Sequence, residues 1–393
     1  MGARFQTRQL ENKKQRLKFV KSGLKFAKNF TNHALEIRKD KNVVCSPAGA
    51  HAILTLVVLG ARKNTLTQLR EVLFLKYNRF NFMLGSSLLM DAVDNMKKVT
   101  FFLANKIYVH EKSKIRKNFI SILRRMYLNE IHLIDRNSSI FVAGANKWVR
   151  GMTNNKIKKI LKKDDVTNTT SFVAFNAVYY YGNWEEPFDP SLTEEQDFYQ
   201  FGGNTIKVPM MCNPSIMLNN GIIDKFYARF IELPYKKRGY KIIIVMPLND
   251  YFVETKFEEL GRHLKDIDYH ILESINSFSR VRLSMPKFTV RSSINLEPIL
   301  KKMGATDMFS SDRADFKLIA ENVKLKVDRV VQKVAIVVNE TASKYNRKNM
   351  YVPGSQYNYM DHININKPFY FAILSPLGVI SEGRIVTPQY EDV

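Results

Sequence analysis

The sequence is poor in the residues that build disulfide frameworks and metal sites. Its 393 residues include two cysteines, Cys45 and Cys212, each among apolar or neutral neighbours. Two distant cysteines exclude a small disulfide-stapled fold, and we expect both to be buried thiols. The seven histidines make neither a His-Glu-x-x-His motif nor a paired Cys/His spacing, which argues against a zinc site.

Catalytic signatures and long apolar runs are also missing. There is no Gly-x-Ser-x-Gly elbow, and the FGGN run at 201–204 is followed by Thr205 instead of the Gly-Lys-Ser/Thr of a phosphate loop. The longest apolar stretch, about ten residues from Ala52, is too short to cross the hydrocarbon layer of a membrane as a helix. The sequence therefore predicts no enzyme, no cofactor and no membrane span.

The N-terminus carries charge without the apolar core of a secretory signal. On that ground we expect a cytoplasmic protein, with leaderless release to the outside of the cell as the alternative. The richness in Lys, Asn, Ile and Tyr is typical of an AT-rich genome, and a poxviral source is one interpretation.

Negative charge is scarce, with 37 Asp and Glu against 61 Lys and Arg and a formal net charge of +24. Most of the excess lies in residues 1–28 and 106–163. Clustered cations attract polyanions at long range, so the second segment predicts a surface for a sulfated glycan or another polyanion. A solvated basic face without a ligand is the alternative. The candidate residues are Arg116, Lys117, Arg124, Arg125, Lys158, Lys159 and Lys162.

The hydrophobic pattern changes along the chain. The first third has apolar residues at helical spacing, for example Phe19, Phe26 and Phe30, and it contains a nearly all-apolar helix that starts after Ser46 with Pro47. From residue 171 onward, short β-rich runs follow one another. Helices followed by many strands, without a repeat or a long linker, predict a single α+β domain.

Motifs in a fixed order extend over nearly the whole chain. The quoted runs are NVVCSPAGAHAILTLVVLGA from Asn42, WVRGMTNNKIKKIL from Trp148, FVAFNAVYYYGNWEEPF from Phe172 and KPFYFAILSPLGVISEGRIVTP from Lys367. They resemble the motifs of the serpins, a superfamily of serine protease inhibitors. The resemblance implies the serpin fold, in which helices pack on three β-sheets with an exposed reactive-centre loop, in a monomer.

The resemblance also places the boundaries of the domain. Residues 22–388 are expected to form one serpin domain, with the reactive-centre loop at about 340–363. Residues 1–21 are a basic N-terminal extension that could be disordered, and residues 389–393 are a tail.

The reactive-centre loop of this family is a bait that a protease cleaves. Counting from the two ends of the loop places the cleaved bond near Gln356 or Tyr357. Tyr357 would suit a chymotrypsin-like serine protease, whereas Asp361 keeps an aspartate-directed cysteine protease open as the target. In the family, the cleaved loop then inserts as a strand into the large β-sheet and carries the attached protease with it.

The part of the loop that inserts first, called the hinge here, departs from the family pattern of small residues. An inserting strand turns alternate side chains inward, and an unpaired inward Arg347 would cost several kcal/mol. This charge favours a non-inhibitory or substrate-like binding role with a basic, polyanion-attracting surface, and a working suicide inhibitor is the alternative. The hinge residues are Glu340, Thr341, Ala342, Ser343, Tyr345 and Arg347.

Two further sites follow from the resemblance. Trp184 and Glu340 match the point where the loop first enters the sheet. The polar gate under the sheet consists of Ser46 and Asn176, which match the family, and of Gly49 and Gln332, which replace a serine and a histidine. Both a repacked, working gate and a lost gate are open at this point.

Overall fold

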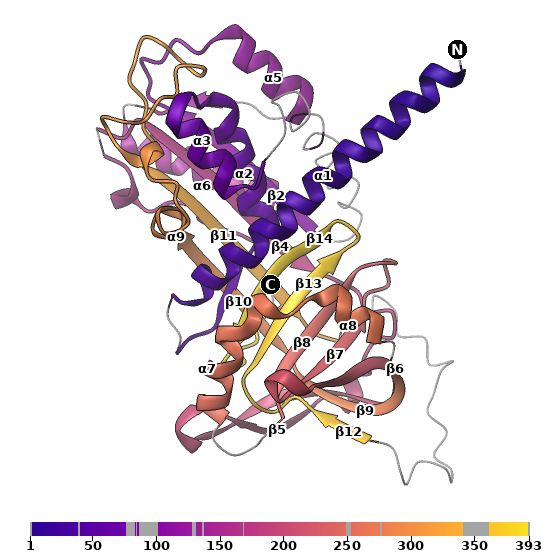
Figure 1. Cartoon of the computed structure of the whole chain (residues 1–393). Coiled ribbons are helices and arrows are strands. Elements are labelled where there is room, and N and C mark those ends of the chain that lie inside the picture. The colour runs from indigo at the N-terminus through magenta and orange to yellow at the C-terminus, as the bar shows by residue number, and fades with distance from the viewer. Residues whose placement is uncertain are drawn as a thin grey trace. The chain divides into compact units, whose positions relative to one another are not determined.

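The structure, a computed structural model, describes residues 2–37, 40–75, 83, 85, 101–127, 131–135, 137–167, 169–248, 253–275, 277–340 and 361–391 (Figure 1). The chain divides into two compact units. The first unit consists of residues 1–34, 45–179 and 292–335, and the second of residues 35–44, 180–291 and 336–393.

The first unit contains most of the helices and most of a five-stranded sheet. Its strands follow the order β10-β11-β4-β2-β3, so β4 and β11 are direct neighbours. The helices are α1 (Gly2–Leu35), α2 (Pro47–Gly60), α3 (Lys63–Val72), α5 (Lys117–Tyr127), α6 (Ser138–Met152) and α9 (Glu297–Lys302). The strands are β2 (Phe101–Val109), β3 (Ile131–Leu133), β4 (Phe172–Tyr181), β10 (Phe288–Asn295) and β11 (Arg329–Val338).

The second unit is built on a nine-stranded sheet in the order β1-β14-β13-β8-β7-β6-β9-β12, with β5 paired to β6. It also contains the helices α7 (Val253–His263) and α8 (Tyr269–Ile275). The strands are β1 (Val43–Cys45), β5 (Glu194–Tyr199), β6 (Thr205–Ile223), β7 (Ala228–Pro234), β8 (Lys241–Pro247), β9 (Phe278–Pro286), β12 (Asp361–Asn364), β13 (Phe369–Ser375) and β14 (Gly378–Ile385).

The α+β class is confirmed, and in the described parts of the chain the pairing of strands links the expected sheets into a nine-stranded and a five-stranded sheet. The strand β6 is 19 residues long and pairs with β5 and β9 along its first part and with β7 along its last part. A single continuous strand therefore connects what would otherwise be two sheets.

Two expectations for the helices can be compared with the structure. The helix α2 is buried almost throughout, and it begins as predicted, because Ser46 accepts a hydrogen bond from the Gly49 amide at 3.1 Å. The residues of the basic N-terminal extension belong to α1, which begins at Gly2, and the expectation that they could be disordered stays a prediction. These residues continue the helix whose buried face carries Phe19, Phe26 and Phe30. The domain boundaries drawn from the sequence stay predictions.

Candidate functional site

The strand β11 leads directly into the segment that the sequence predicts to be the bait loop. Residues 341–360 lie outside the described residues, and the last described residue before them is Glu340. The predicted residues that fall in the undescribed segment are Thr341, Ala342, Ser343, Tyr345, Arg347, Gln356 and Tyr357. The structure thus describes where this segment leaves the fold at Glu340 and where it returns at Asp361.

Trp184 holds the chain just before the loop starts. Its indole Nε1 donates a hydrogen bond to the Asn339 carbonyl at 2.8 Å. The indole is 3% exposed and stacks on the Tyr235 ring, with 4.6 Å between the ring centroids. Gly182 permits this packing, because a Cβ at that position would lie 2.5 Å from the Tyr235 ring. The predicted entry residue Trp184 is therefore in direct contact with the root of the loop.

Glu340, the first hinge residue, is a buried and fully paired carboxylate. It is 8% exposed; its Oε1 accepts a hydrogen bond from the Thr193 hydroxyl at 2.8 Å, and its Oε2 lies 3.1 Å from the Lys287 Nζ. Lys287 in turn lies over the Tyr390 ring, 4.3 Å from its centroid. A buried charge is tolerated when it is paired and hydrogen-bonded, so this arrangement fixes the N-terminal root of the loop.

The predicted gate is a connected, buried hydrogen-bond network around Gln332. The Gln332 amide Nε2 donates to the Ser46 carbonyl and to Asn176 Oδ1, both at 2.8 Å, and its Oε1 accepts from the Ser46 amide at 2.9 Å. Gln332, Ser46 and Asn176 are all completely buried. Buried polar networks are stabilising when their members are satisfied, and the amide of Gln332 is satisfied here; whether the gate works stays a prediction.

The remaining gate position, Gly49, is a glycine because Asn176 occupies the space beside it. A Cβ on Gly49 would lie 2.4 Å from Asn176 Oδ1, far inside the normal contact distance. The Asn176 amide also donates to Asn105 Oδ1 at 2.8 Å. Asn105, on β2, was missed by the sequence analysis, because a lone asparagine in a strand gives no sequence signal of its partner.

The C-terminal end of the loop is anchored at β12. This strand pairs in parallel with β9, and Asp361 forms an ion pair with Arg229, with the NH1 and Oδ2 atoms 2.8 Å apart. In the next residue, His362, the Nε2 atom lies 3.1 Å from the Ser284 hydroxyl oxygen. Burial, and then the charge of Arg282, lower the pKa of His362 below its usual value. Asp361 is therefore part of this anchor.

The predicted polyanion residues fall on two separate elements. Arg116 and Lys117 lie at the start of α5, and Arg116 pairs with Glu321. Arg124 is exposed on α5, and the side chain of Arg125 lies outside the described residues. Lys158, Lys159 and Lys162 are exposed in the connection that follows α6.

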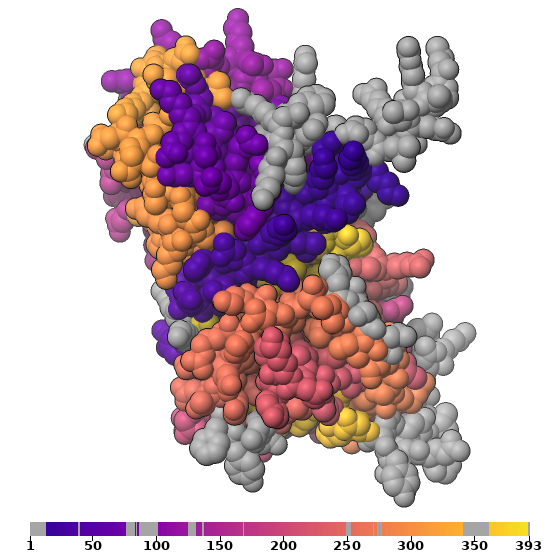
Figure 2. Space-filling model, in the orientation of Figure 1, coloured from indigo at the N-terminus to yellow at the C-terminus, as the bar shows by residue number. Residues whose placement is uncertain are grey.

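A regular lysine stripe on α1 was missed by counting charges alone. Lys14, Lys18, Lys21, Lys25 and Lys28 follow one another at intervals of four and three residues, which places them on one face of the helix. All of them are exposed or half-buried, and Figure 2 shows α1, in indigo, at the surface. The stripe is about 21 Å long at 1.5 Å per residue.

The described part of the chain offers neither a cluster of metal ligands nor a helix that could span a membrane. Among those residues, no group of three or more His, Cys, Asp or Glu side chains could hold a metal ion. None of their helices is both long enough and apolar enough to pass through a membrane.

Comparison with known proteins agrees with the geometry. A family model described as serpin (serine protease inhibitor) matches residues 21–388. Antitrypsin from Bombyx mori is 31% identical over 291 residues, which cover 71% of each chain. Human glia-derived nexin is 28% identical over 318 residues, which cover 80% of this chain and 79% of the nexin.

Solved structures show the same likeness. Native protease nexin-1, crystallised with heparin, superposes with a TM-score of 0.83 at 26% identity and covers 95% of this chain and 100% of its own. Serpin48 of the insect Tenebrio molitor superposes with a TM-score of 0.80 at 25% identity, covering 95% of this chain and 99% of its own.

These relatives come from insects and vertebrates, so they lend no support to a poxviral source. The matched family consists of protease inhibitors, in line with the prediction that the chain is no enzyme. The chain belongs to the serpin family.

Proposed function

We propose that this serpin is a suicide inhibitor of a chymotrypsin-like serine protease and acts by insertion of its cleaved loop. The observation that carries the proposal is the satisfied network around Gln332, because it joins the two strands between which the loop would enter, β4 and β11, to the start of α2. The paired Glu340 and the Trp184 contact at the root of the loop add support. So do the relatives named antitrypsin and antichymotrypsin-2 from Bombyx mori.

The reaction begins as an ordinary proteolysis. The protease serine attacks the carbonyl carbon of the bait bond near Gln356 or Tyr357, the C–N bond breaks, and the N-terminal part of the loop remains as an ester on the protease. The freed strand then enters between the neighbours β4 and β11 and completes a six-stranded arrangement in this sheet. Inhibition results when insertion is faster than hydrolysis of the ester.

The charged hinge determines what fraction of the cleaved loops insert before the ester is hydrolysed. Arg347 follows Ser343 at an even spacing, so both side chains turn inward on an inserting strand, and an unpaired arginine there slows insertion. A fraction of the protein is then cleaved without trapping the protease. If all of the protein is cleaved without trapping the protease, it is a substrate-like binding protein, which is the second candidate function.

Incubation with chymotrypsin followed by denaturing electrophoresis tests the proposal. We expect a covalent complex that resists denaturant, together with a cleaved band. The triple variant Tyr345→Ala, Arg347→Ala, Lys348→Ala has lost the inward charge. We therefore expect the number of inhibitor molecules consumed per inhibited protease molecule to be at least about twofold lower for this variant than for the natural chain. The control variant Ser343→Arg adds an inward charge and should be cleaved without forming a complex. Cleavage without a complex in both the natural chain and the triple variant would reject inhibition of this protease.

We also propose that the α1 stripe of lysines 14, 18, 21, 25 and 28 recruits a sulfated glycan. A row of like charges on one helix face matches a linear polyanion, and the buried opposite face excludes insertion of this helix into lipid. Support comes from the nexin relative that was crystallised with heparin.

Elution from immobilised heparin tests the stripe. The variant Lys14→Ala, Lys21→Ala, Lys25→Ala should elute at a clearly lower salt concentration than the natural chain. A control with equal charge, Lys236→Ala, Lys265→Ala, Lys317→Ala, should change elution much less, because these exposed lysines are scattered. Equal shifts in the two variants would show that net charge alone governs retention. Duplex DNA on the column distinguishes nucleic acid from glycan.

A further inference from the structure

A cleft of about 780 Å³ lies in the second unit, next to the strand β12. All of the described residues that line it belong to this unit. They come from the turn after β5, from β7, from the end of β8, from the start of α7 and from residues 362–367 (Figure 1). Sites for small molecules usually have volumes of roughly 300–1,000 Å³. The cleft is therefore large enough for a compact organic ligand.

One part of the lining is aromatic and rests on the core of the unit. Phe201 packs against the buried cluster, and the centroid of its ring lies 5.5 Å from that of Phe257. Tyr199 lines the cleft with an exposed ring. The FGGN run of 201–204 forms the turn between these elements, and Gly202 and Gly203 have φ values of +73° and +78°, which favour glycine. No side chain therefore projects into the cleft from this part of the wall.

The charged residues of the lining differ in burial. Arg229 has 22% of its side chain exposed, and Lys367 is 4% exposed, with its Nζ donating to the Leu248 carbonyl at 3.3 Å. Glu254, the acid among the described lining residues, is exposed in the first turn of α7. Exposed charges are screened by water and salt, whereas charges of low exposure act more strongly. The two cations therefore outweigh Glu254 inside the cleft.

Arg229 keeps hydrogen-bond donors for a ligand. Its NH1 atom lies 2.8 Å from Oδ2 of the exposed Asp361. Among the described residues, Asp361 is the partner of the Arg229 guanidinium, and no second one is present. A guanidinium has five N–H donors in a planar fork, which matches the oxygens of a carboxylate or a sulfonate. The donors that Asp361 does not use can therefore bind an anionic group.

We infer that this cleft binds a small aromatic anion, whose ring packs on Tyr199 and Phe201 and whose acidic group contacts Arg229. An aromatic carboxylate or sulfonate has the two properties that the lining calls for, an apolar face and a compact negative charge. The inference goes beyond the proposed function and does not depend on it, because the cleft requires neither a protease nor insertion of the loop.

Two fluorescent probes test the site on the full chain. Anilinonaphthalene sulfonate is an aromatic anion, and phenylnaphthylamine is the neutral compound with the same rings; both become brighter in apolar surroundings. The variant Arg229→Met should raise the dissociation constant of the sulfonate at least about fivefold, because it removes the donors for the anionic group. It should change that of the neutral probe by less than about twofold, since the aromatic wall stays.

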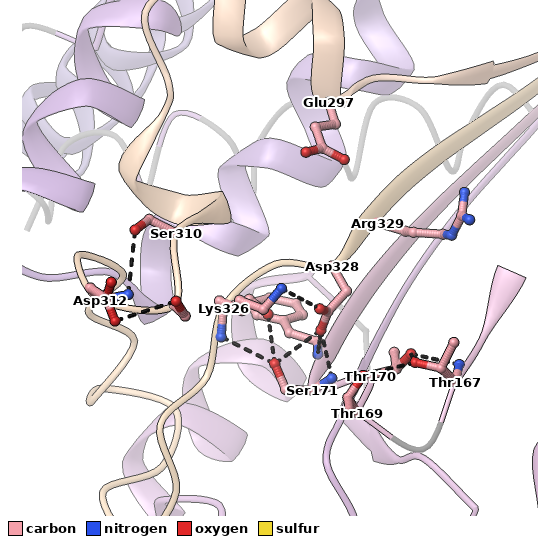
Figure 3. Close-up of polar contacts among 12 residues, drawn as sticks. Thr167, Thr169, Thr170, Ser171, Glu297, Ser310, Asp312, Lys326, Asp328 and Arg329 are labelled. Atoms are coloured by element: carbon pink, nitrogen blue, oxygen red, sulfur yellow. Dashed lines mark hydrogen bonds and ion pairs between the residues drawn. The ribbon is translucent and has the colours of Figure 1, made fainter.

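The matched control is Arg329→Met. Arg329, on β11 (Figure 3), is also half-buried and pairs with an aspartate, Asp165, with 3.4 Å between NH1 and Oδ1. It belongs to the first unit and does not line the cleft, so this variant should bind both probes like the natural chain. Equal losses of sulfonate binding in the two arginine variants would overturn the site, because net charge would then explain them.

A change of the opposite sign comes from the acid in the lining. Glu254→Gln removes a negative charge and should lower the dissociation constant of the sulfonate by about twofold. The neutral probe should not respond to this variant. Weaker sulfonate binding in Glu254→Gln would contradict the placement of the anionic group in the cleft.

Tyr199→Ala keeps the test valid if Arg229→Met folds poorly, because it changes an exposed side chain. It should weaken the binding of both probes at least about threefold, since both use the aromatic wall. The control Phe278→Ala removes another exposed aromatic ring of the second unit, outside the cleft, and should leave both affinities unchanged. Sulfonate binding that equals that of the natural chain in both Arg229→Met and Tyr199→Ala would overturn the inference, because the probe would then bind elsewhere.

Discussion

Replacing Gln332 by leucine should lower the free energy of unfolding by about 2–5 kcal/mol, because buried partners lose their hydrogen bonds. Gln332 donates to the Ser46 carbonyl and to Asn176 Oδ1 and accepts from the Ser46 amide. The Ser46 carbonyl keeps its bond from the Ala50 amide at 2.9 Å. The Ser46 amide and Asn176 Oδ1 would lose these bonds with Gln332, and each costs roughly 1–3 kcal/mol when it is left unsatisfied in the interior.

Urea unfolding followed by circular dichroism measures this loss. Gln389→Leu is the matched control, because it makes the same chemical change at an exposed side chain and should shift stability by less than about 0.5 kcal/mol. Gln332→His restores the residue that the family usually has. Its free energy of unfolding should lie between that of Gln332→Leu and that of the natural chain, since an imidazole cannot make all three bonds of the Gln332 amide at once. Equal losses for Gln332→Leu and Gln389→Leu would contradict the structural role of the gate.

Local sequence signals were sufficient for elements whose partners lie nearby in the chain. The start of α2 was predicted from Ser46 and Pro47, because a capping residue and its acceptor amide are only three positions apart. The hydrophobic pattern indicated the α+β class for the same reason. Trp184 and Glu340 were found through the family resemblance, and their partners, Asn339, Thr193 and Lys287, became visible only in the structure.

Features that depend on distant residues could not be predicted. The sequence shows that glutamine and glycine replace a histidine and a serine, but not that the Gln332 amide reaches both backbone groups of Ser46. The joining of two sheets by β6 depends on where its partners β7 and β9 pair, which spacing does not reveal. The α1 lysine stripe is different, because its intervals of three and four are present in the sequence and a periodicity test would have found it.

The gate also explains why position 49 is a glycine, and a pair of glycine substitutions tests this explanation. Gly49→Ala places a Cβ at 2.4 Å from Asn176 Oδ1 and at 2.9 Å from its Cγ and Nδ2. The Asn176 amide cannot move away freely, since Gln332 and Asn105 both hold it. We expect a loss of about 2–4 kcal/mol in the free energy of unfolding, from overpacking and from strained hydrogen bonds.

The control, Gly144→Ala, makes the same change in the exposed part of α6, where a Cβ meets no atom within 4 Å. Alanine is a better helix former than glycine, so this variant should gain about 0.5–1 kcal/mol. The two substitutions are thus expected to differ in sign, which separates packing against Asn176 from helix propensity. In the double variant Gly49→Ala, Asn176→Ala, the clash is removed, so its loss should be smaller than the sum of the two single losses by about 1 kcal/mol or more. Strict additivity would mean that Asn176 is not what excludes a side chain at position 49.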